Sequence, residues 1–289
     1  MKVFVHHGAL RSMWEASDAL VQKALSLILE KKLPQFTKKH CYHLKDNKGL
    51  KAAVRSAHNK AQEYKYVLKV DVKSYYQSLD HETLYQLCKK YCAEQSVLKL
   101  LWRAIKRVDL NGGIYTECQQ GIPTGSSLSN IFGAIYLSSV DKHFSQRKGV
   151  YYIRYMDDII IMTNSSYQLR RSLKSIYALM SQLKISIHRN NEKFYIGKIE
   201  HGFDFLGYRI NKTKYLSLTK KTLQNHFAKL RALYEQRSSH KKIAQYRKRF
   251  WTWVRGGLAG TKVISLECTP AVTALLWRFR AAGGAAGLW

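Results

Sequence analysis

The chain has 289 residues, of which 46% are hydrophobic, so it is long enough to bury a sizeable core. Its 49 Lys and Arg residues against 19 Asp and Glu give a formal net charge of +30. Solubility alone does not require so large an excess, which favours a polyanionic partner such as a nucleic acid. No apolar run is long enough to span a membrane, and the N-terminal apolar segment is too short for a signal peptide, so we expect a cytoplasmic protein.

The first part of the chain is predicted to be helical. Residues 19–31 carry apolar side chains at helical spacing, with Ser17 as the N-cap and Pro34 after the end. This predicted apolar face consists of Leu20, Ala24, Leu27 and Ile28. The basic stretch that follows, residues 38–51, is predicted to be a loop.

The next segment is predicted to be a strand followed by helices. Residues 66–72 are rich in β-branched residues, and Asp71 lies near the end of this strand. Asp80 is expected to cap the following helix. After Pro123, one long helix is predicted, because the apolar residues between Leu128 and Val140 share one face.

A pair of adjacent carboxylates then separates two short apolar runs. Residues 150–155 and 159–162 are predicted to be strands, with Asp157 and Asp158 in the turn between them. Burying such strands beside two acids is costly unless a cation neutralises them, and a divalent metal is the expected cation. The alternative is a solvated Asp-Asp hairpin turn.

Beyond this hairpin, a helix is predicted from Leu169 to Leu183, followed by strands at 185–187, 193–199 and 203–210. The order of strand, helices, strand-turn-strand, helix and strands indicates an α+β fold with helices on one face of a sheet.

The last third of the chain changes character. Residues 212–262 contain 14 Lys and Arg residues against one acid, Glu235. Two apolar stripes predict two amphipathic helices with basic outer faces: Leu223, Phe227, Leu230 and Tyr234, then Ile243, Tyr246, Phe250 and Val254. Such faces can be merely solvated, but this composition favours a surface that follows phosphates. The candidate nucleic-acid contacts are Lys241, Lys242, Arg247 and Lys248.

Five motifs follow one another between Asp71 and Tyr208. They are DVKSYYQSLD (71–80), QGIPTGSSLSN (120–130), RYMDD (154–158), NNEK (190–193) and FDFLGY (203–208). In this order they resemble the palm of reverse transcriptases, specifically the bacterial group II intron, diversity-generating and related types. The resemblance implies a right-hand polymerase. It would have partial fingers at residues 1–62, a palm at 63–211, a basic helical thumb at 212–262 and a C-terminal tail of unknown role at 263–289.

The resemblance also implies an activity. The chain would be an RNA-directed DNA polymerase that adds deoxynucleotides to a primer 3′ end by a two-metal mechanism, with Asp71, Asp157 and Asp158 as ligands of two Mg²⁺ ions. In-line phosphoryl transfer needs carboxylates from separate elements that converge on one point, and these three acids meet that need.

Further roles follow from the same motifs. The Val72 backbone would help to hold the triphosphate. Tyr76 would exclude a 2′-hydroxyl or else pack the core, and Gln120 and Gly121 would line the nucleotide pocket. Lys193 would neutralise the leaving pyrophosphate or else be an ordinary surface lysine. The primer grip would consist of Phe205, Leu206, Gly207 and Tyr208.

The expected partners are an RNA template, a DNA or RNA primer, deoxynucleotides and a cognate non-coding RNA, with no membrane. The family usually has a further basic strand before the fingers segment. Its expected absence here suggests that an RNA or a protein partner completes the fingers. Two alternatives stay open: a defence-associated enzyme that acts on one cognate RNA or without a template, and a non-catalytic, maturase-like RNA-binding protein.

Overall fold

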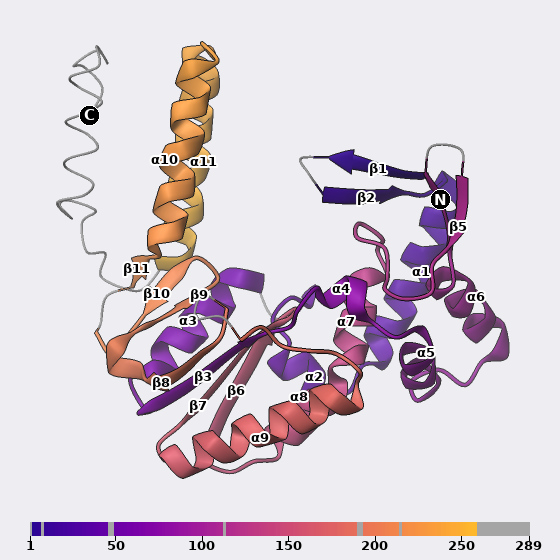
Figure 1. Cartoon of the computed structure of the whole chain (residues 1–289), viewed down its shortest axis with the longest axis horizontal. Coiled ribbons are helices and arrows are strands. Elements are labelled where there is room, and N and C mark those ends of the chain that lie inside the picture. The colour runs from indigo at the N-terminus through magenta and orange to yellow at the C-terminus, as the bar shows by residue number, and fades with distance from the viewer. Residues whose placement is uncertain are drawn as a thin grey trace. The chain divides into compact units, whose positions relative to one another are not determined.

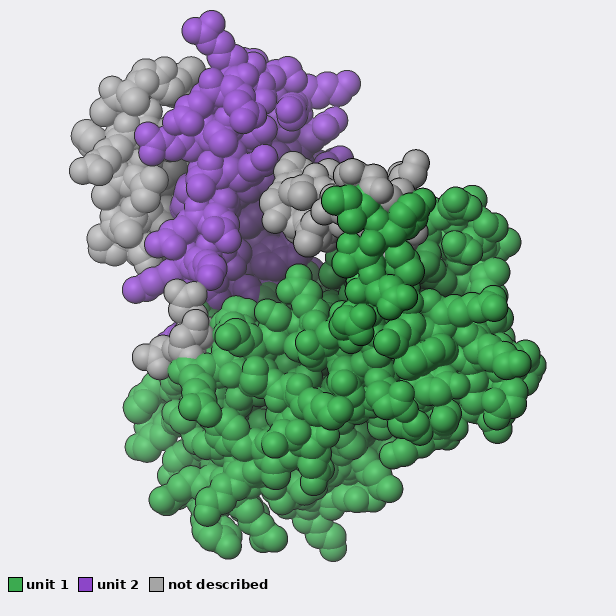
Figure 2. All heavy atoms as spheres, turned by 45° about the vertical axis from the view of Figure 1, so that its right-hand side comes forward, with its two compact units in different colours: residues 1–206, 210–212 green, residues 207–209, 213–289 purple. Residues whose placement is uncertain are grey.

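The computed structural model describes residues 2–6, 9–45, 49–111, 114–189, 193–213 and 216–258. The chain forms two compact units (Figure 2). The first unit comprises residues 1–206 and 210–212, and the second comprises residues 207–209 and 213–289. Within the described ranges, no helix is both long and apolar enough to cross a membrane.

A four-stranded sheet forms the framework of the first unit. Its strands are β3 (Tyr66–Asp71), β6 (Val150–Tyr155), β7 (Asp158–Thr163) and β8 (Tyr195–Lys198), in the antiparallel order β6-β7-β3-β8. Residues on both faces of β3 and β7 are fully buried, which explains their nearly continuous apolar sequence. Other parts of the chain therefore cover both faces of these two strands, and the mixture of helices with antiparallel strands confirms the predicted α+β class.

Some helices of the first unit contact this sheet, and others lie beside it (Figure 1). In chain order they are α1 (Ala16–Lys32), α2 (Gln35–His40), α3 (Gly49–Ala61), α4 (Tyr75–Ser78), α5 (His81–Lys89), α6 (Gln95–Ile105), α7 (Ser129–Tyr136), α8 (Ser138–Ser145) and α9 (Ser166–Gln182). Helix α9 contacts β3 and β7, whereas α3 and α8 contact β6. Asp80 caps α5 as predicted, because its side chain accepts a hydrogen bond from the Thr83 amide.

Helix α1 buries a different face from the one that its sequence predicted. The buried residues are Gln22, Leu25, Ser26 and Leu29. Leu20, on the predicted face, is 72% exposed, and Leu27 and Ile28 are also exposed. Ser17 is not the N-cap, because the helix begins at Ala16 after Glu15. Both faces of α1 carry apolar side chains, so periodicity alone could not select the one that packs.

Three further boundaries differ from the predictions. The two ends of the predicted loop at residues 38–51 are helical, since α2 runs to His40 and α3 begins at Gly49. The long helix is interrupted at Leu137, which separates α7 from α8. Both halves are largely buried, and a one-residue break leaves the apolar pattern intact.

The predicted strands after α9 are shorter than expected. Residues 185–187 contribute only an isolated bridge between Ile187 and Val72. The predicted strand 203–210 is interrupted by a turn, so it forms β9 (Phe203–Phe205) and β10 (Tyr208–Ile210). Leu206 and Gly207 in that turn have φ angles of 49° and 88°. A leucine in this left-handed region is uncommon, so Gly207 was the local signal that marked the turn.

A second sheet of the first unit was not predicted. It contains β1 (Lys2–His6), β2 (Ala9–Met13), β4 (Val108–Asn111) and β5 (Ile114–Glu117), in the order β2-β1-β4-β5. The β1–β4 pair is parallel and joins the start of the chain to a segment about a hundred residues later. These short strands depend on that distant pairing, which a local pattern does not reveal.

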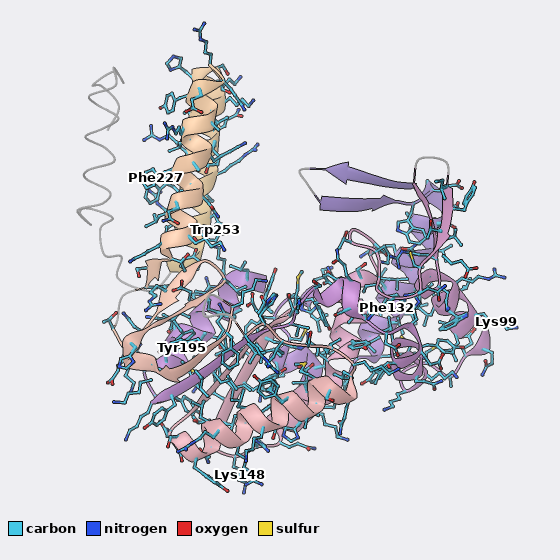
Figure 3. The ribbon with its side chains drawn as sticks, viewed as in Figure 1. Lys99, Phe132, Lys148, Tyr195, Phe227 and Trp253 are labelled. Carbon is cyan, nitrogen blue, oxygen red and sulfur yellow. The ribbon has the colours of Figure 1, made fainter. Side chains whose placement is uncertain are left out.

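The second unit contains a pair of helices. They are α10 (Lys220–Glu235) and α11 (His240–Leu258), preceded by a pairing of β10 with β11 (Ser217–Leu218). The rings of His226 and Phe250 stack with their centroids 3.6 Å apart. The ring of Trp253, which is labelled in Figure 3, stacks on Tyr208 with a centroid distance of 5.1 Å. Two amphipathic helices are confirmed, but the predicted stripe on α10 is displaced: His226 and Leu233 are buried, whereas Tyr234 is half exposed.

Candidate active site

Three carboxylates lie at one end of the β3–β7 strand pair. Asp71 is the last residue of β3, and Asp158 is the first residue of β7. The antiparallel register makes these two residues direct partners, and Asp157 immediately precedes Asp158. We call residues 155–158 the carboxylate turn; Met156 within it has a φ of 54°. Strand pairing, rather than a long loop, therefore brings the acids together.

Burial and mutual repulsion perturb these acids. The pKa of Asp158 is raised to about 7, first by burial and then by the charges of Asp157 and Asp71, against the opposing charges of Lys69 and Lys193. Burial is also the largest cause of the raised pKa of Asp157, to which the charge of Asp71 contributes. Ionising all of these groups at once therefore requires additional positive charge nearby.

Two basic side chains supply part of that charge. Lys193 Nζ donates a hydrogen bond to Asp71 Oδ1 at 3.0 Å, and His188 Nε2 lies 3.4 Å from the same oxygen. The structure thus brings Lys193 from the fourth motif to the acids, while residues 190–192 of that motif lie outside the described residues. Sequence reasoning did not select His188.

The chemistry of the donor set fits a divalent cation. Carboxylate oxygens are preferred ligands of Mg²⁺, and a cation would favour the ionised forms of Asp157 and Asp158, whose pKa values are raised. The side chains do not form a ready-made coordination cluster. No group of three His, Cys, Asp or Glu residues among the described residues is arranged to hold a metal ion.

A fully buried ion pair supports the carboxylate turn. Arg154 Nε and Nη2 donate to the two oxygens of Asp141 at 2.7 and 2.8 Å, and both side chains are 0% exposed. Asp141 Oδ1 also accepts a hydrogen bond from the Tyr152 hydroxyl at 2.7 Å. Arg154 also donates to the carbonyls of Met156 and Ala134. The guanidinium therefore links the turn to helix α8 and to the preceding helix, α7.

A histidine holds the other side of the same turn. The Met156 amide donates to His43 Nδ1 at 3.0 Å, and the thiol of Cys41 lies 3.2 Å from that nitrogen. His43 Nε2 lies 3.1 Å from the carbonyl oxygen of Asn130, on α7. Burial, followed by the charge of Arg154, lowers the pKa of His43 to about 4, so the ring is neutral at pH 7.

Sequence reasoning did not select Asp141 or His43 for this site, and it named Arg154 only as the first residue of the RYMDD motif. Two signals pointed to the ion pair: an arginine within a strand predicted to be buried, and an aspartate directly after Val140 on an apolar helix face. His43 lay in a stretch predicted to be a loop, and nothing in its sequence context indicated a contact with the turn.

The candidate nucleotide-pocket residues surround helix α4. Val72 is buried, and the half-buried Tyr76 donates from its hydroxyl to Asn130 Oδ1 at 3.4 Å. Gln120 Nε2 donates to the Ser78 carbonyl. Gly121 has a φ of 81°, and a Cβ there would meet the Gln77 carbonyl at 2.7 Å. The glycine is thus required for close approach to α4, which begins directly before Tyr76.

The candidate primer-grip residues differ in exposure. The Phe205 and Tyr208 side chains are fully buried, and the Tyr208 hydroxyl donates to the Trp253 and Val254 carbonyls within the second unit. Leu206 and Gly207 are half-buried. A contact with a primer can therefore come from the turn at Leu206 and Gly207, while the two aromatic side chains are committed to packing.

The candidate nucleic-acid residues lie on α11. Lys241, Lys242 and Lys248 are exposed, and Arg247 is half-buried. The charge of Arg247 contributes, after burial, to the lowered pKa of His226. These side chains thus give one helix of the second unit a concentration of positive charge.

The chain resembles known proteins over this region. It is 19% identical over 230 residues to Protein YkfC of Escherichia coli (strain K12), covering 67% of this chain and 60% of that protein. It is 24% identical over 132 residues to the group II intron-encoded protein LtrA of Lactococcus lactis subsp. cremoris, covering 46% of this chain and 22% of LtrA. The chain therefore spans less than two thirds of each of these relatives.

Solved structures share the fold. The telomerase from Candida tropicalis in complex with a TWJ fragment of telomeric RNA has a TM-score of 0.56 at 15% identity, covering 94% of this chain and 48% of that one. The corresponding telomerase complex from Candida albicans has a TM-score of 0.54 at 13% identity, covering 83% and 46%. Residues 10–210 match the sequence profile of the reverse transcriptase (RNA-dependent DNA polymerase) family, and this chain belongs to that family.

Proposed function

We propose that the chain is an RNA-directed DNA polymerase, a nucleotidyltransferase that extends a primer 3′ end with deoxynucleotides on an RNA template. The observation that carries this proposal is the β3–β7 register, which sets Asp71 opposite Asp158 with Asp157 beside them. Family membership supports the same activity. We assign residues 1–62 to the fingers, 63–211 to the palm and 212–262 to the thumb.

Asp71, Asp157 and Asp158 would hold two Mg²⁺ ions. When bound, such ions activate the primer hydroxyl and stabilise the leaving oxygen in an in-line displacement. Lys193 would offset negative charge on the triphosphate and the leaving pyrophosphate, and its hydrogen bond to Asp71 supports this role. Val72 would offer its backbone to the triphosphate. Tyr76, on the helix that Gln120 and Gly121 hold in place, would lie against the incoming sugar and disfavour a 2′-hydroxyl.

The partners would be an RNA template, a DNA or RNA primer and deoxynucleotides. The net charge of +30 and the exposed lysines of α11 support nucleic-acid binding. We further propose that the enzyme works in the cytoplasm with a cognate non-coding RNA. A defence-associated enzyme would extend a primer only on its cognate RNA, whereas a general reverse transcriptase would also use unrelated templates.

Primer extension on a defined RNA template with deoxynucleotides and Mg²⁺ tests the activity. Asp157→Asn should abolish extension and leave RNA affinity unchanged, because it removes one carboxylate and no basic group. Asp18→Asn, at an exposed position in the first turn of α1, is the matched control and should retain activity. Extension by Asp157→Asn at the parent rate would refute the assignment of the site.

A further inference from the structure

The main-chain polar groups of Met156 are both held by side chains from outside the carboxylate turn. The carbonyl accepts from Arg154 Nη1 at 3.1 Å, and the amide donates to His43 Nδ1 at 3.0 Å. Met156 is a non-glycine residue in the left-handed region, directly before Asp157. Its conformation therefore depends on these two contacts, and a change at either one would be transmitted to the next residue, Asp157.

His43 is suited to this contact by its protonation pattern. Nδ1 faces two donors, the Met156 amide and the Cys41 thiol, so it acts as an acceptor. Burial raises the pKa of Cys41 to about 12, which keeps this sulfur a thiol. Nε2 faces the Asn130 carbonyl at 3.1 Å and therefore carries the proton. The surroundings thus select one neutral tautomer, with an acceptor toward the turn and a donor toward α7.

On its Nε2 side, the His43 ring is connected through Asn130 to Tyr76, the candidate contact with the incoming sugar. Asn130 gives its carbonyl to His43 and its side-chain oxygen to the Tyr76 hydroxyl, at 3.4 Å. His43 therefore connects two parts of the candidate site that come from different elements. One is the turn that carries Asp157, and the other is the helix residue that meets Tyr76.

We propose, on the basis of the function proposed above, that His43 is a positioning residue for this polymerase. It fixes the carboxylate turn through Met156 and ties that turn to Asn130. His43 touches neither Asp157 nor Tyr76 in the described contacts, so its effect on catalysis is indirect. The hydrogen bonds of the neutral His43 ring to Met156 and Asn130 carry this role.

Two conservative substitutions test the roles of the two ring nitrogens of His43 separately. In His43→Asn, the side-chain oxygen can take the place of Nδ1 and accept from Met156, while the donor to Asn130 is lost. In His43→Gln, the side-chain amide can take the place of Nε2 and donate to Asn130, while the acceptor for Met156 is lost. His43→Leu has a similar volume and removes both. His40→Asn is the control, because His40 contacts the Tyr152 carbonyl at 2.8 Å and not the turn.

The first measurement is hydrogen exchange of the Met156 amide, which reports the contact whether or not the protein polymerises. We expect slow exchange in the parent, His40→Asn and His43→Asn proteins, and fast exchange in His43→Leu and His43→Gln. The second measurement is primer extension. We expect kcat to fall about ten- to a hundredfold in His43→Leu with little change in the nucleotide KM, and to recover in His43→Asn.

Equal exchange rates in the parent and His43→Leu proteins would overturn the proposal. So would a kcat in His43→Asn as low as in His43→Leu when both retain the melting temperature of His40→Asn. A parent protein that fails to extend any primer would refute the proposed function instead. In that case the Met156 exchange pattern would still decide whether His43 holds the turn.

Discussion

The buried Asp141–Arg154 pair gives a sharp test of how the site is supported. In Asp141→Asn, the arginine keeps its charge but loses its carboxylate partner. The neutral acceptors that remain, among them the carbonyls of Met156 and Ala134, cannot balance that charge. Both side chains are 0% exposed, so water cannot replace the lost partner. Breaking such a pair costs about 3–5 kcal/mol, a large part of the 5–15 kcal/mol that stabilises a typical protein.

For a unit of this size, that loss corresponds to a melting temperature lower by roughly 6–20 °C. Thermal unfolding followed by far-UV circular dichroism measures it. The double variant Asp141→Asn/Arg154→Met should recover part of the loss, since it leaves no unpaired charge. Glu63→Gln, which breaks the exposed Lys60–Glu63 pair, is the control and should leave the midpoint unchanged. If Asp141→Asn behaves like Glu63→Gln, the buried pair does not stabilise the site as argued.

Two further predictions concern the carboxylates and the basic helix. The pKa of Asp158 is higher in the folded chain than in the unfolded one, so only the unfolded chain releases this proton between about pH 4 and pH 7, and stability should fall as pH rises through that window. Mg²⁺ should raise the melting temperature more at pH 8 than at pH 5. Asp158→Asn should remove both the fall in stability with pH and the pH dependence of the Mg²⁺ effect. A pH profile like that of the parent in this variant would contradict the assignment of Asp158 as the titrating group. RNA affinity should fall steeply with salt, and reversing the charge of four α11 residues should flatten the slope of log K against log[salt] by about 3–4 without changing single-nucleotide chemistry. The four residues are Lys241, Lys242, Arg247 and Lys248. An unchanged slope would show that this face is only solvated.

The sequence was sufficient for the parts of the fold that local chemistry determines. Strands β3, β6 and β7 were predicted because runs rich in β-branched and aromatic residues lie next to Asp71 or the Asp157–Asp158 pair. The five motifs then identified these acids as the expected catalytic residues of a reverse transcriptase. The Asp80 cap was predicted because a short acceptor before a helix has a specific local partner, here the Thr83 amide.

The predictions that failed concern contacts between segments that lie far apart in the sequence. Helix α1 has apolar residues on two faces, and only the packing of α6 and α7 against it decides that Leu25 is buried and Leu20 is exposed. The β1–β4 pair and the His43–Met156 contact join segments about a hundred residues apart. Periodicity and motifs describe neighbours along the chain, so they contain no information about these contacts.

The strand order also has a consequence for how the protein is made. Strand β3 lies between β7 and β8, both of which are synthesised after it. A growing chain therefore carries β3, buried on both faces in the final structure, with both edges unpaired until most of the first unit has left the ribosome. Exposed apolar edges of this kind favour aggregation during slow folding. Chaperone binding over residues 66–71 during synthesis would therefore raise the yield of folded protein. Asp71, at the end of this strand, would reach its final place only after β7 and β8 have paired with β3.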